Sequence, residues 1–325
     1  MATEAKLRDD LDTRLRSAPR GGFTQAARVA ARARLLAMGL PGRRDEYWRF
    51  TDPAELNAAL PVAAEDPVAE APLSADGALA LRFDGGRAGP VPAAPAGCDI
   101  SLLGAADASD IHWAGSLYGT LEASGQMPVK RPFAALNTVT ATEGLLLRVT
   151  SGKPVVQVEY GVGSRDSDTC LHHCIRVAEG AELTLIEAGR AGARSNIVIE
   201  VDLAPGARFH HIRAQGRDAD RRTITHIFAR IGAGASFKSF TYGENGRLTR
   251  NEAILDIVGD HAVAHVAGVA LGNGAVQPVL QDDTVFITHG AVGCESRQVY
   301  KKVLRNGATG VFQGKILVKP GAQKT

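Results

Sequence analysis

The stretch Cys-Leu-His-His-Cys at residues 170–174 is the sharpest candidate for chemistry in the sequence. Side chains of an extended strand alternate between two faces, so Cys170, His172 and Cys174 should share one face, roughly 6.5 to 7 Å from one to the next. Thiolate and imidazole groups suit zinc or iron, with a water completing the coordination. Direct ligands of one ion lie closer together than this, so two packing thiols beside a histidine fit the pattern as well. Both interpretations stay open.

A second set of reactive side chains lies between residues 282 and 294. Asp282, Asp283, His289 and Cys294 occur close together in the sequence. An acid, a histidine and a cysteine could form a nucleophilic site if they met in space. The remaining strand histidines have no second ligand at a recognised spacing, so we expect structural roles for His210, His211, His226 and His265.

Phosphate-binding motifs are not matched. The stretch GVFQGKI resembles the end of a phosphate-binding loop, but Thr309 stands where the first glycine belongs and Ile316 where a serine or threonine binds magnesium. The stretch YGVGSRD at 160–166 has no third glycine, so it is not a dinucleotide fingerprint. We therefore expect that any ATP hydrolysis linked to this protein takes place on another subunit.

The elements that position these residues are mainly strands. Residues 23–38 are rich in alanine, arginine and leucine, which predicts one helix, and from about Leu145 the pattern is β. In the stretch 196–203 apolar residues alternate with Asn196, Glu200 and Asp202, which predicts a strand with one buried face. Many short strands with almost no helix between them exclude a doubly wound fold. A sandwich and a solenoid remain.

A recurring corner favours the solenoid. Gly-Ala or a similar pair precedes an apolar strand at Ala181, Ala207, Ala235 and Ala262, in steps of 26, 28 and 27 residues. Regular spacing of this kind is typical of stacked rungs. The next such corner, at Ala308, follows after 46 residues and breaks the series, although a weaker corner at Gly290 and Ala291 divides that step unequally.

Composition excludes several classes of partner. The chain of 325 residues has 37 basic and 35 acidic side chains, so no overall field points to nucleic acid or to an anionic membrane. We find no membrane-spanning run and no signal-peptide pattern, which favours a cytoplasmic protein. The four cysteines have no disulfide-framework spacing and should be thiols in a reducing compartment.

Several stretches resemble the SufD branch of the SufB/SufD superfamily, which belongs to the Suf iron–sulfur cluster assembly machinery. They are GLPGRRDEYWRFTDPAEL (39–56), FAALNTVTATEGLLLRV (133–149), EGAELTLIEA (179–188) and the whole of 282–325. The resemblance runs from about residue 23 to the end, and the segment RRDEYWRFTD favours SufD over SufB.

The resemblance implies a mainly β fold, a right-handed parallel β-helix behind a small helical N-terminal domain. It divides the chain into a helical domain at 1–60, a linker with first strands at 61–140 and the β-helix at 141–325. It also implies a non-enzymatic scaffold that pairs with SufB and with the ATPase SufC. The scaffold would have no intrinsic cofactor, and the iron–sulfur cluster would be assembled transiently on the complex.

The sequence departs from the family pattern at its end. In the family, further strands and C-terminal helices follow the AQKT stretch, whereas here the chain ends at Thr325. We therefore expect a truncated β-helix that self-associates through its open end. His289 lies in a stretch that matches an earlier family segment, so it does not inherit the family's cluster-ligand role.

Two other functions stay open. One is a cytoplasmic metal-binding β protein or enzyme that uses Cys170, His172 and Cys174. The other is a β-helix enzyme that acts on polysaccharide, a class that is usually exported.

Overall fold

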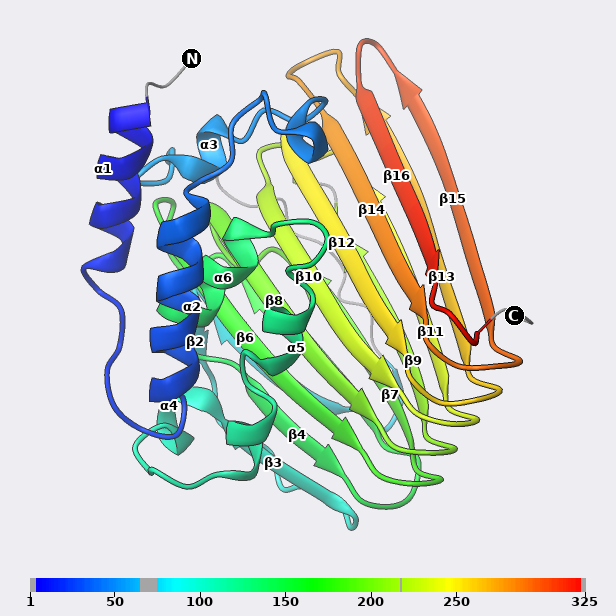
Figure 1. Ribbon diagram of the computed structural model, residues 1–325. Coiled ribbons are helices and arrows are strands. Elements are labelled where there is room, and N and C mark those ends of the chain that lie inside the picture. The colour runs from blue at the N-terminus through cyan, green and yellow to red at the C-terminus, as the bar shows by residue number, and fades with distance from the viewer. Residues whose placement is uncertain (1–3, 65–74, 217, 323–325) are drawn as a thin grey trace.

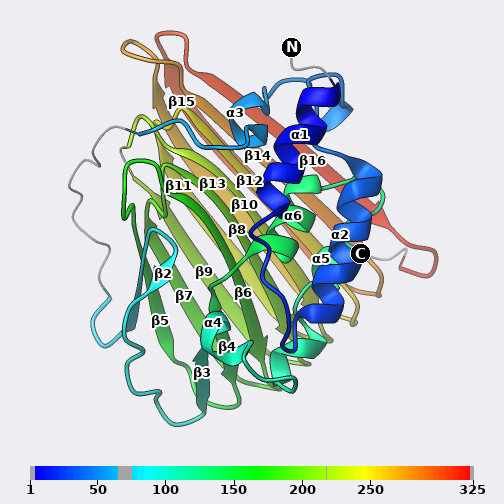
Figure 2. The same ribbon diagram turned by 90° about the vertical axis from the view of Figure 1, so that its left-hand side faces the viewer.

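Two sheets lie face to face, and helices cover the outer face of one of them (Figure 1, Figure 2). The computed structural model describes residues 4–64, 75–216 and 218–322. Its helices are α1 (Glu4–Leu15), α2 (Gln25–Met38), η1 (Glu46–Trp48), α3 (Ala54–Asn57), α4 (Leu103–Ala106), η2 (Trp113–Ser116), α5 (Thr120–Ser124) and α6 (Pro132–Thr140).

The sheet without a helical cover, here called the open sheet, has the order β15-β13-β11-β9-β7-β5-β1-β2. Its strands are β1 (Leu79–Asp84), β2 (Arg87–Ala88), β5 (Val155–Gly161), β7 (Glu182–Gly189), β9 (Arg208–Gln215), β11 (Ser236–Glu244), β13 (Val263–Asn273) and β15 (Glu295–Arg305).

The sheet under the helices, here called the covered sheet, has the order β16-β14-β12-β10-β8-β6-β4-β3. Its strands are β3 (Cys98–Leu102), β4 (Leu145–Val149), β6 (Asp168–Val177), β8 (Arg194–Leu203), β10 (Arg222–Ile231), β12 (Leu248–Ile257), β14 (Leu280–His289) and β16 (Thr309–Val318).

From β4 onward the chain alternates between the two sheets, so each pair of strands makes one turn of a solenoid. Every strand from β4 to β14 pairs in parallel with the next strand of its own sheet, as in β6 with β8 and β8 with β10. The solenoid has about six turns over residues 146–318. The predicted β-helix behind a helical N-terminal region is confirmed, and the sandwich is excluded.

The recurring corner is the turn that leads into the open sheet. Ala181, Ala207, Ala235 and Ala262 are buried and directly precede β7, β9, β11 and β13. The residue after each corner donates its backbone N–H to the corner carbonyl of the turn below, as Arg208 does to Ala181 at 2.9 Å. Glu295 donates to Ala262 in the same way, so Cys294 is the fifth member of the stack. Ala308 lies in the opposite corner, between β15 and β16, which explains the broken series.

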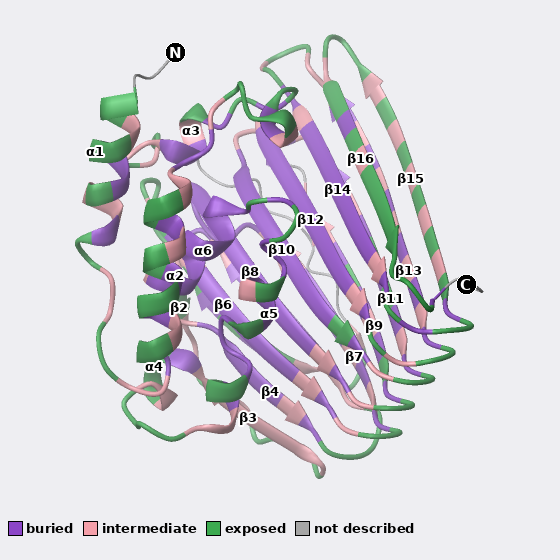
Figure 3. Ribbon diagram, in the orientation of Figure 1, coloured by how far each residue is buried: buried purple, intermediate pink, exposed green. Residues whose placement is uncertain are grey.

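Burial differs between the two sheets. In β13 buried and half-buried residues alternate, because one face of the open sheet lies on the core and the other meets solvent. In β8, β10 and β12 nearly every residue is buried (Figure 3). The sequence predicts one buried face for 196–203, whereas nearly every residue of β8, on both faces, is buried. Asn196 and Glu200 lie beneath the helices and are buried.

The helical layer forms a second core over the covered sheet. Leu117, Leu121 and Val129 pack there against Val198 and Phe228 of the strands. Helix α6 is buried from Pro132 to Val139 and contacts both β6 and β8. This layer brings the chain between residues 113 and 140 onto the outer face of β6, where the candidate ligands lie.

Candidate metal centre

Strand β6 presents the predicted ligands to the helical layer. Leu171 and Ile175 of β6 belong to the core between the sheets, whereas Cys174, with Cys170 beside it, belongs to the core under the helices. Cys170, His172 and Cys174 therefore share one face of the strand, as strand geometry predicts.

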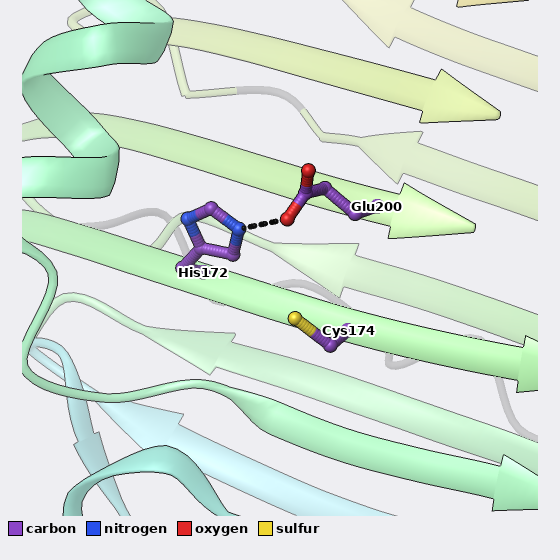
Figure 4. Close-up of side chains that lie close together, drawn as sticks. All are labelled: His172, Cys174 and Glu200. Carbon is purple, nitrogen blue, oxygen red and sulfur yellow. Dashed lines mark hydrogen bonds and ion pairs between the residues drawn. The ribbon is translucent and has the colours of Figure 1, made fainter. Parts of the chain in front are cut away.

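Only two of the three lie in one cluster, and a residue from the neighbouring strand joins them. The ligand atoms of His172, Cys174 and Glu200 all lie within 4.8 Å of one another (Figure 4). Glu200 is the register partner of Cys174 across β6 and β8, and its Oε2 lies 2.9 Å from His172 Nε2. Cys170 instead lies 3.3 Å from the hydroxyl of Thr140 at the end of α6.

Glu200 was missed because the sequence pattern assigns only the apolar face of 196–203 to a core. The alternation in 196–203 correctly separates it from the apolar face, but no local pattern reveals that helices cover the other face. Glu200 lies beside Cys174 because of the parallel register of β6 with β8. That register is set by the stacking of one solenoid turn on the next, which no local sequence pattern shows.

The cluster is held rigidly by the helical layer. Glu200 accepts the backbone N–H of Gly119 at 2.6 Å and that of Glu122 at 2.8 Å, so it fixes the start of α5. His172 Nδ1 lies 3.0 Å from Asn137 Oδ1, and the ring of Tyr118 lies over the imidazole with centroids 4.1 Å apart. All these side chains are buried.

Hydrogen bonding orients the His172 ring. The Asn137 side-chain nitrogen donates to the carbonyls of Leu171 and Asn196, so its Oδ1 accepts from His172 Nδ1. The other ring nitrogen, Nε2, lies 2.9 Å from the Glu200 carboxylate. Burial raises the pKa of Cys174 well above its ordinary value, with Glu200 adding to the rise, so this thiol is protonated. Burial also raises the pKa of Cys170 to about 11.

The second predicted set does not assemble. Asp282 and His289 lie near opposite ends of β14, roughly 23 Å apart at strand spacing, and Cys294 lies in the corner before β15. Asp282 binds Arg250 at 2.5 Å and accepts a hydrogen bond from Thr51, so it ties the N-terminal region to the covered sheet. The nucleophilic hypothesis is excluded by these positions.

The other buried histidines take part in structural contacts or have no partner. His211 lies 2.6 Å from Glu187, which also binds Arg213 and Tyr160 inside the solenoid. Burial acts to raise the pKa of Glu187, but Arg213 and His211 reverse this and hold it well below its usual range. Neither ring nitrogen of His226 has a hydrogen-bond partner among the described residues.

The glycine-lysine stretch that resembles a phosphate loop lies within strand β16, not in a loop before a helix. A phosphate-binding loop requires the latter arrangement. No helix in the described part of the chain is long and apolar enough to cross a membrane.

Two comparisons with known proteins indicate the same family. Residues 161–325 match the family model described as "SUF system FeS cluster assembly, SufBD core domain". The chain is also 25% identical over 311 residues to the iron-sulfur cluster assembly protein SufD of Escherichia coli (strain K12). That similarity covers 90% of this chain and 69% of the relative.

Proposed function

Because the chain belongs to the SufBD core-domain family of the SUF iron–sulfur cluster assembly system, we propose that it is a SufD-type scaffold subunit. It pairs with SufB, works with the ATPase SufC and acts in the cytoplasm. The iron–sulfur cluster is the cargo of the complex, assembled on it transiently, and is not a resident cofactor of this chain.

The extent of the two similarities is the observation that carries the proposal. The family match covers β6 to β16, which form most of the solenoid. The similarity to SufD spans 90% of the chain and therefore includes part of the helical region before the solenoid. A likeness limited to stacked strands would support the fold alone, whereas this one extends to the helices that cover it.

A scaffold role agrees with the positions of the reactive side chains. Asp282 lies at the opposite end of β14 from His289, and the buried ion pairs connect elements instead of lining an open cleft. Arg131 of the helical layer, for example, binds Glu252 of β12 at 3.0 Å with both side chains buried. Buried ion pairs of this kind fix the helical layer to the solenoid, which favours a rigid surface on which partners assemble.

Co-purification tests the proposal directly. The chain would be co-expressed with SufB and SufC from the same genome, with the affinity tag on SufB alone. We expect the chain to remain with SufB and SufC through gel filtration, and to hydrolyse no ATP when purified alone. SufB expressed with an unrelated solenoid protein serves as the control. Quantitative loss of the chain from the SufB column would refute the assignment.

A further inference from the structure

We propose that His172, Cys174 and Glu200 form a buried binding site for one divalent transition-metal ion of the zinc or ferrous iron class. The proposal goes beyond the scaffold role, because it concerns a resident ion in this chain and not the assembled cluster.

Cross-strand pairing brings the ligands within reach of one ion. Cys170 lies outside the cluster, beside Thr140, so Cys170, His172 and Cys174 do not act together. Glu200 supplies the third ligand, because it lies beside Cys174 on the neighbouring strand and within hydrogen-bond distance of His172. One nitrogen, one sulfur and one oxygen ligand within 4.8 Å of one another suit zinc or ferrous iron.

The surrounding contacts resemble those that orient ligands in metal sites. A metal-binding histidine usually donates its other ring N–H to an oxygen, which fixes the ring and its tautomer. Asn137 Oδ1 takes this position at His172 Nδ1, and the amide of Asn137 is itself held by two backbone carbonyls. The Glu200 carboxylate is fixed by two backbone N–H groups. These contacts hold Nε2 and Oε2 in place, and Sγ of Cys174 lies within 4.8 Å of both.

A divalent ion would balance the charges of these ligands. The thiolate, not the thiol, is the form of cysteine that binds a metal. A neutral imidazole, a carboxylate and a thiolate around a divalent ion leave no uncompensated charge in the buried layer.

Metal content and spectroscopy test the site. The chain would be produced without a polyhistidine tag in medium supplemented with zinc and iron, and its metal content measured after gel filtration. We expect about one ion per chain in the wild type. In Cys174→Ser the content should fall about tenfold or more.

Cys170→Ser is the matched control, because Cys170 lies on the same strand face but outside the cluster. It should keep the wild-type metal content. Wild-type protein without metal, or Cys174→Ser with the full complement, would overturn the proposal.

A second measurement does not depend on the variants folding. Wild-type protein stripped by chelator and loaded with Co²⁺ should show thiolate-to-cobalt charge-transfer absorption. Cobalt binding without a thiolate band would also overturn the proposal, because Cys174 would then not be a ligand.

Discussion

At the scale of single residues, two buried histidines differ in their partners. His226 is fully buried, and its Nε2 lies 3.9 Å from the Glu252 carboxylate, too far for a hydrogen bond. His173 is equally buried, but it accepts the backbone N–H of Leu145 at 2.8 Å and lies 3.1 Å from the hydroxyl of Tyr160. Burial lowers the pKa of each histidine to about 4.

The shared pKa shift predicts acid sensitivity. In the unfolded chain each histidine titrates near 6.5, so as pH falls the unfolded state takes up the proton first and the folded state loses stability. Each histidine should remove roughly 2 kcal/mol from the free energy of unfolding between pH 7 and pH 5. Urea unfolding at both pH values measures this. His226→Leu should lessen the dependence, and an unchanged slope in that variant would contradict the assignment.

The different partners predict opposite outcomes at neutral pH. His226→Leu removes two unpartnered nitrogens, so the free energy of unfolding at pH 7.5 should stay the same or rise. His173→Leu leaves the buried Leu145 N–H without an acceptor and should cost roughly 1–3 kcal/mol. The two variants have the same side-chain change and control for each other in one urea experiment. Equal losses would show that the hydrogen bonds of His173 contribute nothing.

At the scale of elements, the corner before the open sheet has one unfavourable residue. Gly180, Gly206, Gly234 and Gly293 occupy the same corner position with φ between +62° and +67°. His261 occupies it in the turn before β13 with φ +58°. A side chain at such φ is strained, because its Cβ approaches the following carbonyl.

His261→Gly should therefore stabilise the protein. We expect the free energy of unfolding to rise by roughly 0.5–1 kcal/mol. The relief of backbone strain is partly offset because glycine has greater freedom in the unfolded chain. His261→Ala keeps the Cβ and serves as the control, with no gain expected. Thermal and urea unfolding would measure the stability of both variants against the wild type. An equal gain from alanine would mean that the imidazole, not the backbone, is the source of strain.

The repeated corners of the solenoid could be predicted from the sequence, whereas the helical cover could not. The corner alanines predict the stack correctly because each turn repeats the same local geometry. Cys294 has no alanine signal, and the long strand β13 places it farther along the chain than the regular spacing predicts. Helix α6 has no periodic signal, since it is buried on all sides and is apolar throughout most of its length. The burial of Glu200 follows from that helix and from strand register, neither of which is a local property of the sequence.

At the scale of the whole molecule, the solenoid is asymmetric. One sheet lies under a helical layer that is tied to it by the buried ion pair of Arg131 with Glu252 and by the hydrogen bond from Thr51 to Asp282. The other sheet leaves its outer face open to solvent (Figure 2, Figure 3). A rigid body with one sealed and one open side suits a subunit whose task is to hold partners in place. This architecture agrees with membership of the SufBD family.

Cluster assembly by the reconstituted complex is the most direct test of this account. SufB and SufC would be isolated anaerobically with and without this chain, supplied with iron and sulfide, and assayed for transfer of an iron–sulfur cluster to an apo-ferredoxin. We expect that transfer depends on the chain and that the chain stays in the complex throughout. Transfer at the same rate and yield from SufB and SufC without the chain would contradict the scaffold role.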